Sequence, residues 1–293
     1  MTIYYDDYDI AVKNILARVG KTIVIGVPLG IGKPIGFLNT LYRHASEDKS
    51  ISLTIMTALT LTRPQIHTDF EKRFLDPILE RILGDYEDPL YEHFRAKQQL
   101  PSNIKVIEFF ITPGNYLKNS KVQQDYISSN YTNVVRDTLN HSINVLAQQV
   151  SRSDAYPDQY SISSNTDLFS DVAQSLRKLE SEGKKIAIVA EINTNLPFML
   201  GDAIIKSEIF TEIVDTKKYK SLFAFPKPQL SIQDHLIGLY SSSFIKDGSC
   251  LQMGIGKLSD AISSAIMLRH KNNNKYHAHY FTIEMYSGGY SLM

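Results

Sequence analysis

Short, continuous runs of β-branched and other apolar residues alternate with longer amphipathic segments along most of this chain. Continuous apolar runs are typical of parallel strands that are buried on both faces. Strands that alternate with helices favour parallel α/β layers. The predicted strands are 21–26, 50–56, 104–110 and 185–191, and the predicted helices are 35–44, 69–83 and 131–147. We therefore expect an α/β protein with open, mostly parallel sheets and flanking helices. We also expect Pro77 to kink or break the second of these helices, because proline lacks the N–H that a helix interior needs.

A stretch without clear periodicity, 219–229, contains Pro226 and Pro228 and predicts a linker. We place a domain boundary there, with a first α/β domain over 1–218 and the linker and start of a second α/β domain over 219–293. The second domain should repeat the strand–turn–helix pattern. Its expected parts are a strand at 250–253, a glycine turn at 254–256, a helix at 258–269 and a last strand at 276–285.

The composition excludes several classes of protein. Lysine plus arginine and aspartate plus glutamate each number 31 among 293 residues, so nothing in the net charge indicates nucleic acid or a membrane as partner. The single cysteine, Cys250, excludes a disulfide framework and a multi-cysteine metal site. His277 and His279 would share one face of a strand, but no third ligand lies nearby, so no metal is expected. Because no apolar run is long enough to span a membrane and the acidic start is no signal peptide, we expect a cytoplasmic location.

The tetrapeptide Gly-Ile-Gly-Lys occurs twice, at 30–33 and at 254–257, and indicates an α/β unit used twice. A glycine turn that opens a helix lets backbone N–H groups approach a phosphate or a developing oxyanion. A phosphate loop does not fit the first turn, because Val27 and Pro34 stand where glycine and serine or threonine are required. The dinucleotide fingerprint also fits poorly, since Gly36 comes one residue late. On spacing alone, two tight structural turns explain the pattern equally well.

Glu284 is a second candidate for chemistry. It lies near the carboxyl end of the predicted strand 276–285, where ligands of open α/β sheets bind. Apolar neighbours would remove water from this carboxylate, which raises its pKa and its reactivity as a nucleophile. The corresponding region of the first unit, 58–60, holds no acid. The pattern by itself nevertheless favours a solvated glutamate at a strand end.

Two segments carry a resemblance to a known family. The runs DGSCLQMGIGKLSDAI at 247–262 and TIEMYSGG at 282–289 resemble the acetyl-CoA hydrolase/transferase family, which belongs to the coenzyme A transferases with a glutamate nucleophile. The loop 193–202, with Asn193, Pro197 and Gly201, resembles the Asn–Pro–Gly–Asp loop of this family. The resemblance implies a coenzyme A transferase fold and covers nearly the whole chain.

The resemblance also implies which residues form the site. It assigns the catalytic role to Glu284. The oxyanion and CoA-binding residues would be Gln252, Met253, Gly254, Ile255 and Gly256. A possible substrate pocket would be formed by Gly30, Gly32, Asn193, Pro197 and Gly201.

The implied reaction moves CoA from an acyl-CoA to a small carboxylate such as acetate, or to water, through a glutamyl-CoA thioester on Glu284. Coenzyme A would be a substrate, with no further cofactor and no metal. The expected partners are acyl-CoA and small carboxylates, and the resemblance implies a homodimer for the full-length protein.

Several features depart from the family pattern. Phe198 stands where many relatives have arginine, and Gly288 stands where aspartate is usual. The chain stops nine residues after Glu284, whereas family members continue, so we expect an amino-terminal portion that by itself need not be active. Two other functions therefore stay open. One is a catalytically idle CoA-binding homologue, and the other, suggested by 30–36, is an NADP-dependent oxidoreductase.

Overall fold

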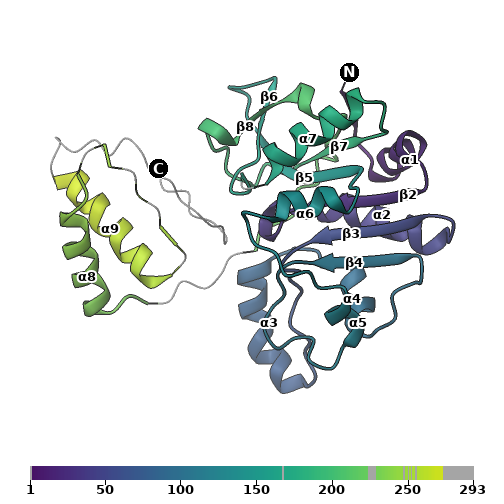
Figure 1. Ribbon diagram of the computed structural model, residues 1–293. Coiled ribbons are helices and arrows are strands. Elements are labelled where there is room, and N and C mark those ends of the chain that lie inside the picture. Colours follow the sequence, from purple (N-terminus) through teal and green to yellow (C-terminus); the bar gives the residue numbers. More distant parts are fainter. Residues whose placement is uncertain are drawn as a thin grey trace. The chain divides into compact units, whose positions relative to one another are not determined.

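The computed structural model describes residues 2–166, 168–223, 229–246, 248–249, 251, 253–254 and 256–272. These residues fall into two compact units that divide after Phe223 (Figure 1). The domain boundary predicted after residue 218 stays a prediction, and each unit is described by itself below.

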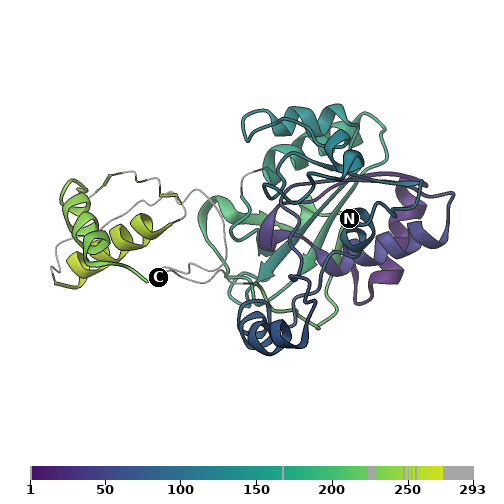
Figure 2. The ribbon, with the colours of Figure 1, turned by 90° about the horizontal axis from the view of Figure 1, so that it is seen from below.

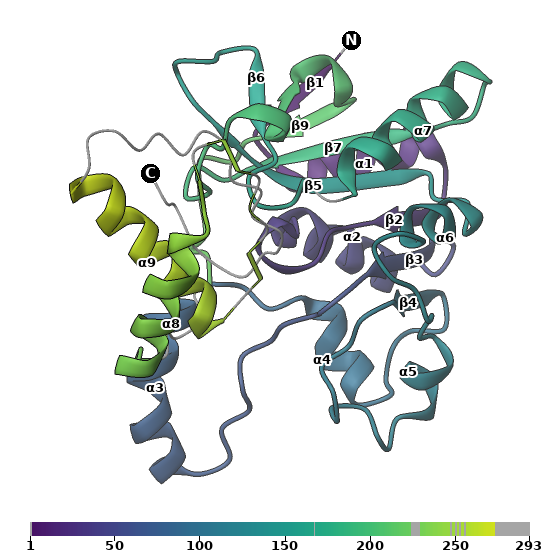
Figure 3. The same cartoon turned by 60° about the vertical axis from the view of Figure 1, so that its left-hand side comes forward.

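The first unit is built on one open sheet. Seven parallel strands follow the order β1-β9-β7-β5-β2-β3-β4 (Figure 3). They are β1 (Ile3–Tyr5), β9 (Glu212–Val214), β7 (Ala187–Ile192), β5 (Val145–Arg152), β2 (Thr22–Gly26), β3 (Ser52–Thr57) and β4 (Ile104–Glu108). Two short antiparallel strands, β6 (Gln159–Ser161) and β8 (Ile204–Lys206), extend from β5. The predicted α/β class with an open, mostly parallel sheet is confirmed.

Helices cover both faces of this sheet (Figure 2). On one face, α1 (Tyr8–Val19), α2 (Ile35–Glu47) and α4 (Leu90–Ala96) enclose a core with Ile23 and Ile25 of β2. On the other face, α6 (Val134–Asn140) and α7 (Phe169–Ser181) pack on a core that includes Leu146 of β5 and Ile188 of β7. Successive strand residues point to opposite faces, so the continuous apolar runs supply both cores.

The predicted helix 131–147 is confirmed only over α6 and is wrong after Asn140. The helix α6 ends at Asn140, and Val145 already begins β5. Between them Ser142 adopts a positive φ of 57°, which a continuing helix does not allow. The Asn144 side chain then donates to the Thr22 carbonyl at 2.8 Å and accepts from the Val24 N–H at 2.9 Å. Pairing with β2 and β7 therefore overrides the helical spacing of the apolar residues in this segment.

The predicted break at Pro77 is also absent, because α3 (Asp69–Leu83) continues through it. Thr68 and Glu71 form a capping box at the start of α3, and both side chains accept hydrogen bonds from backbone N–H groups there. The remaining short elements of the first unit are α5 (Ser120–Gln124) and three 3₁₀ turns, η1 (Gly30–Gly32), η2 (Gly201–Ala203) and η3 (Ser207–Ile209).

The described part of the second unit is a helix pair, α8 (Ile232–Ser243) and α9 (Lys257–Asn272). The helices approach closely at Gly238, where an added Cβ would lie 2.5 Å from the carbonyl oxygen of Ala261. The helix predicted at 258–269 lies within α9. The strand predicted at 250–253 lies partly, and the one at 276–285 wholly, outside the described residues. Within the described ranges, no helix is both long and apolar enough to cross a lipid bilayer.

Candidate functional site

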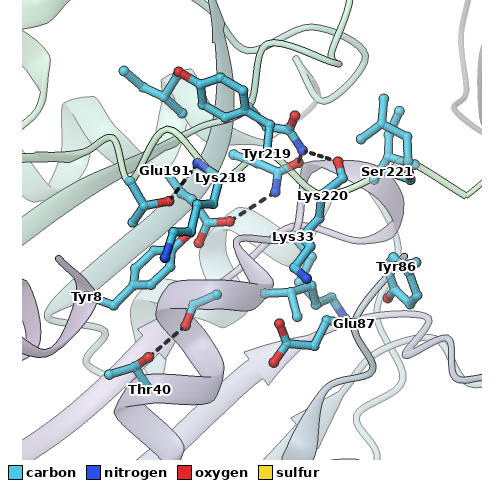
Figure 4. A pocket seen from close by; sticks show the side chains of 18 of the residues that line it. Tyr8, Lys33, Thr40, Tyr86, Glu87, Glu191, Lys218, Tyr219, Lys220 and Ser221 are labelled. Atoms are coloured by element: carbon cyan, nitrogen blue, oxygen red, sulfur yellow. Dashed lines mark hydrogen bonds between the residues drawn. The ribbon is translucent and has the colours of Figure 1, made fainter. Parts of the chain in front are cut away.

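A cavity of about 280 Å³ opens in the first unit, at the carboxyl ends of β2 and β7 (Figure 4). Four segments form most of its wall: the start of α1, the turn η1 with the start of α2, the end of β7, and the loop 216–223. Ligands of open α/β sheets bind at this end of the strands. The cavity is therefore the candidate site of the first unit.

The glycines of the first turn make room for side chains of the protein itself. An added Cβ on Gly32 would lie 2.3 Å from Oδ1 of Asn165, whose Nδ2 donates to the Leu29 carbonyl at 3.0 Å. An added Cβ on Gly36 would lie 2.5 Å from the Tyr8 hydroxyl. Gly30 differs, because it has a positive φ of 66°, faces open space and lines the cavity. Two of the three glycines thus serve close packing rather than ligand approach.

The start of α2 is occupied by a carboxylate of the protein. Glu191, at the end of β7, is 4% exposed. Its Oε2 accepts from the Phe37 N–H at 2.8 Å, and its Oε1 accepts from Nε2 of Gln149 at 3.0 Å. Burial raises the pKa of Glu191 to about 7, although these hydrogen bonds and one from the Gly36 N–H oppose the rise.

This arrangement decides what the first glycine turn can bind. The positive end of a helix dipole attracts an anion, and here Glu191 fills that position. The N–H groups of Gly36 and Phe37 are therefore not available to a phosphate or an oxyanion. This geometry disfavours a dinucleotide site at 30–36 and indicates a structural role for the turn.

A second buried polar cluster lies beside the cavity. The Arg95 guanidinium is 2.5 Å from Oε2 of Glu108 and 3.0 Å from Oε2 of Glu92, and Tyr116 donates to Glu92 at 2.5 Å. Lys33, which lines the cavity, is 3% exposed and donates to the Ala58 carbonyl at 3.3 Å. Burial lowers the pKa of the Lys33 ammonium to about 8, against the attraction of the two glutamates.

The structure brings Gly30 and Asn193 of the predicted pocket to the wall of one cavity. Asn193 follows β7 and donates to the Lys220 carbonyl at 3.0 Å, which ties the loop 216–223 to the strand end. Gly32 faces Asn165 instead, and Pro197 and Gly201 do not line this cavity.

The other predicted site residues belong to the second unit or lie outside the described part. Met253 is buried, and its sulfur accepts a hydrogen bond from Ser263 at 3.4 Å. Gly254 and Gly256 have open space around them. Gln252, Ile255 and Glu284 lie outside the described residues, so their roles stay predictions. Over the same described ranges, no three histidine, cysteine or acidic residues are placed to hold a metal ion.

Sequence reasoning overlooked Glu191 and Lys33 as parts of the site. The available signal for Glu191 was the one that selected Glu284: a single acid at the carboxyl end of an apolar strand. For Lys33 it was the position directly after a glycine turn.

The Phe198 ring, at the position that departs from the family pattern, stacks on Tyr156, with centroids 5.3 Å apart and planes 7° from parallel.

Comparison with known proteins adds independent information. No family model matches the sequence. A segment of 118 residues is 33% identical to the 4-hydroxybutyrate coenzyme A transferase of Clostridium kluyveri, and covers 40% of this chain and 25% of that protein. A segment of 85 residues is 32% identical to the succinyl-CoA:acetate/propanoyl-CoA:succinate CoA transferase of Fasciola hepatica, and covers 29% of this chain and 17% of that protein. The matches thus span a quarter or less of each relative's length.

Among solved structures, RipA from Yersinia pestis has the same fold. It matches with a TM-score of 0.59 at 17% sequence identity, over 93% of this chain and 54% of RipA. Both sequence matches are thus to coenzyme A transferases, and the α/β architecture agrees with the fold that the family resemblance implies.

Proposed function

We propose that the protein transfers CoA from an acyl-CoA thioester to a small carboxylate such as acetate, with water as a second possible acceptor. The observation that carries this proposal is the sequence similarity to two CoA transferases. The cavity at the carboxyl ends of β2 and β7 supports it, because ligands of such sheets bind at this end of the strands. We further propose a homodimer in the cytoplasm.

The reaction would begin at Glu284. Its carboxylate oxygen attacks the thioester carbonyl carbon, the CoA thiolate leaves, and an acyl–glutamyl anhydride remains. The thiolate then attacks the glutamyl carbonyl and releases the acyl group as a free carboxylate, which leaves a glutamyl-CoA thioester. An acceptor carboxylate reverses these steps and takes the CoA, whereas attack by water on the thioester releases CoA and restores Glu284.

The two glycine turns would have different tasks. Backbone N–H groups at Gly254 and Gly256, with the Gln252 side chain, would stabilise the negative charge on the carbonyl oxygen, and one such donor is typically worth about 2.7–4 kcal/mol. The cavity at Gly30 would hold the small carboxylate. Its wall carries Lys218, whose side chain has no hydrogen-bond or ion-pair partner in the described part of the chain.

The test is substitution of the proposed nucleophile in the full-length protein. Glu284→Gln should abolish CoA transfer from acetyl-CoA to a small carboxylate, because an amide cannot form the anhydride. Glu208→Gln is the matched control, since the Glu208 side chain is 75% exposed and should leave transfer unchanged. Transfer retained by a folded Glu284→Gln variant would refute the role of this residue.

A catalytically idle CoA-binding homologue is the second candidate. The observation that favours it is Phe198, which packs on Tyr156 where many relatives have a basic side chain. Acetyl-CoA followed by borohydride separates the two. Borohydride reduces a glutamyl thioester and inactivates a transferase, whereas a protein that only binds CoA gains no modification.

A further inference from the structure

The Glu191 carboxyl has an unusual environment for a buried acid. No lysine, arginine or histidine in the described ranges forms an ion pair with it. It accepts hydrogen bonds from the Phe37 N–H and the Gln149 amide, and the Gly36 N–H and the Tyr8 hydroxyl interact with it as well. A buried carboxylate without a cation is held by dipoles alone, so its charge can be removed without leaving an unpaired cation behind.

Both carboxylate oxygens of Glu191 already accept hydrogen bonds from the protein. An ionised carboxylate offers about four acceptor positions, and the four groups around Glu191 can fill them. Glu191 lines the cavity, but its two hydrogen bonds hold the protein's own segments. It acts instead on the segment that it holds, the start of α2, which directly follows the cavity-lining turn at Gly30.

Tyr8 is the neighbour that can adapt when Glu191 takes up a proton. A hydroxyl both donates and accepts, whereas the N–H groups of Gly36 and Phe37 only donate. The Tyr8 ring lies against Gly36, and both residues line the cavity. Burial raises the pKa of the Tyr8 phenol, as does the charge of Glu191, so Tyr8 stays protonated in the neutral range.

We propose that Glu191 is a positioning residue: in its ionised form it holds the start of α2, Tyr8 and the cavity wall at Gly30 in place, and on protonation it releases them. The consequence for catalysis rests on the proposed function, because it requires that this cavity binds the small carboxylate. The proton itself goes to one carboxyl oxygen, which then donates to Tyr8 and no longer accepts from the backbone.

The groups that face Glu191 come from five segments of the chain. Tyr8 comes from α1, and the neutral Gln149 comes from β5. Glu87, from the segment before α4, raises the pKa of Glu191 further through its negative charge. Lys218, from the loop after β9, lines the same cavity and is drawn on the same side as Tyr8 and Glu191 in Figure 4. α2 contributes only backbone N–H groups.

The test follows the Phe37 and Gly36 amide resonances of the ¹⁵N-labelled full-length protein by NMR across the neutral range. In the wild type both should titrate together with a midpoint near pH 7. Glu191→Gln should abolish this titration, and the exposed control Glu208→Gln should leave it intact. A wild-type Phe37 amide that does not titrate, or one that still titrates in Glu191→Gln, would overturn the proposal.

Tyr8→Phe is the second variant, and it tests the role of Glu191 even if Glu191→Gln fails to fold. Loss of the hydroxyl removes a donor to the ionised carboxylate, so the Phe37 midpoint should move to higher pH. An unchanged midpoint would show that Tyr8 and Glu191 are not coupled and would contradict the proposed release.

Enzyme assays separate this proposal from the proposed function. In Glu191→Gln, kcat for CoA transfer at alkaline pH should fall about tenfold, and the pH dependence of kcat near neutrality should disappear. Titrating amides in a wild type that transfers no CoA would refute the proposed function and leave the positioning role. Active transfer with an unaltered pH profile in Glu191→Gln would refute the positioning role alone.

Discussion

Two buried carboxylates at the same end of the sheet, Glu108 and Glu191, have different kinds of partner. At the end of β4, Glu108 is 1% exposed and meets the Arg95 guanidinium, which also binds Glu92. At the end of β7, Glu191 is similarly buried but meets N–H groups and, among the residues that the structure describes, no cation. A fixed cation makes the first cluster a structural element. Neutral dipoles leave the second site free to gain or lose a proton near neutrality.

The pKa values express this contrast. Burial raises the pKa of Glu92, but the neighbouring Arg95 opposes the rise. Burial lowers the pKa of Arg95, yet the charges of Glu108 and Glu92 outweigh it and raise that pKa overall. The pKa of Glu191, which burial raises and hydrogen bonds from Phe37 and Gln149 only partly lower, reaches about 7. The lesson is that burial alone does not identify a titrating acid, because the type of partner decides the outcome.

The largest effect should come from removing the cation of the first cluster. Arg95→Met would leave Glu92 and Glu108 buried without their counter-charge, which should cost about 3–5 kcal/mol of the free energy of unfolding. Urea denaturation near neutral pH would measure this. Arg136→Met is the control, because Arg136 is 65% exposed and pairs with its neighbour Asp137. Equal losses in both variants would mean that the cluster is not a structural ion pair.

A smaller, pH-dependent effect is expected at Glu191. Its pKa is raised from 4.5 to about 7 on folding, so its contribution to stability is complete below about pH 4.5 and is lost as the pH rises through about 7. The shift corresponds to about 3 kcal/mol. The glutamine of Glu191→Gln does not titrate, so the unfolding free energy of the variant minus that of the wild type should increase as the pH rises from acidic to alkaline. Unfolding free energies of both proteins at several pH values measure this difference. Parallel pH curves for the two proteins would contradict the raised pKa.

The smallest effect concerns the packing that surrounds Glu191. Gly36→Ala should lower the unfolding free energy by about 1 kcal/mol, because the overlap of the new Cβ with Tyr8 outweighs the better helix propensity of alanine. In a Tyr8→Ala background the overlap is gone, and the same substitution should stabilise the protein. Thermal denaturation of the four proteins in this cycle would show the reversal of sign. The same sign in both backgrounds would mean that Tyr8 does not require a glycine at this position.

Part of the candidate site was predictable because it follows from topology. The family resemblance grouped Gly30, after β2, with Asn193, after β7, and both line the cavity. Topology explains this outcome, because parallel strands place their carboxyl ends at one edge of the sheet. The partners of Glu191 were not predictable. Phe37 lies 154 residues away in sequence, and only the packing of α2 against the sheet brings its N–H to that carboxylate.

The residue pattern by itself determined the α/β class and most parallel strands, because continuous apolar runs bury equally on both faces of a sheet. Tertiary structure decided the segment 143–152, whose apolar spacing suits a helix but whose backbone pairs with β2 and β7. Tertiary structure also decided that Gly32 makes room for Asn165 and Gly36 for Tyr8. It placed Glu191 in the interior with N–H donors and, within the described part of the chain, no cation. The physical reason is the same in each case. The spacing of apolar residues along the sequence indicates which side chains are buried, whereas strand partners and counter-charges come from distant residues that only the folded chain brings together.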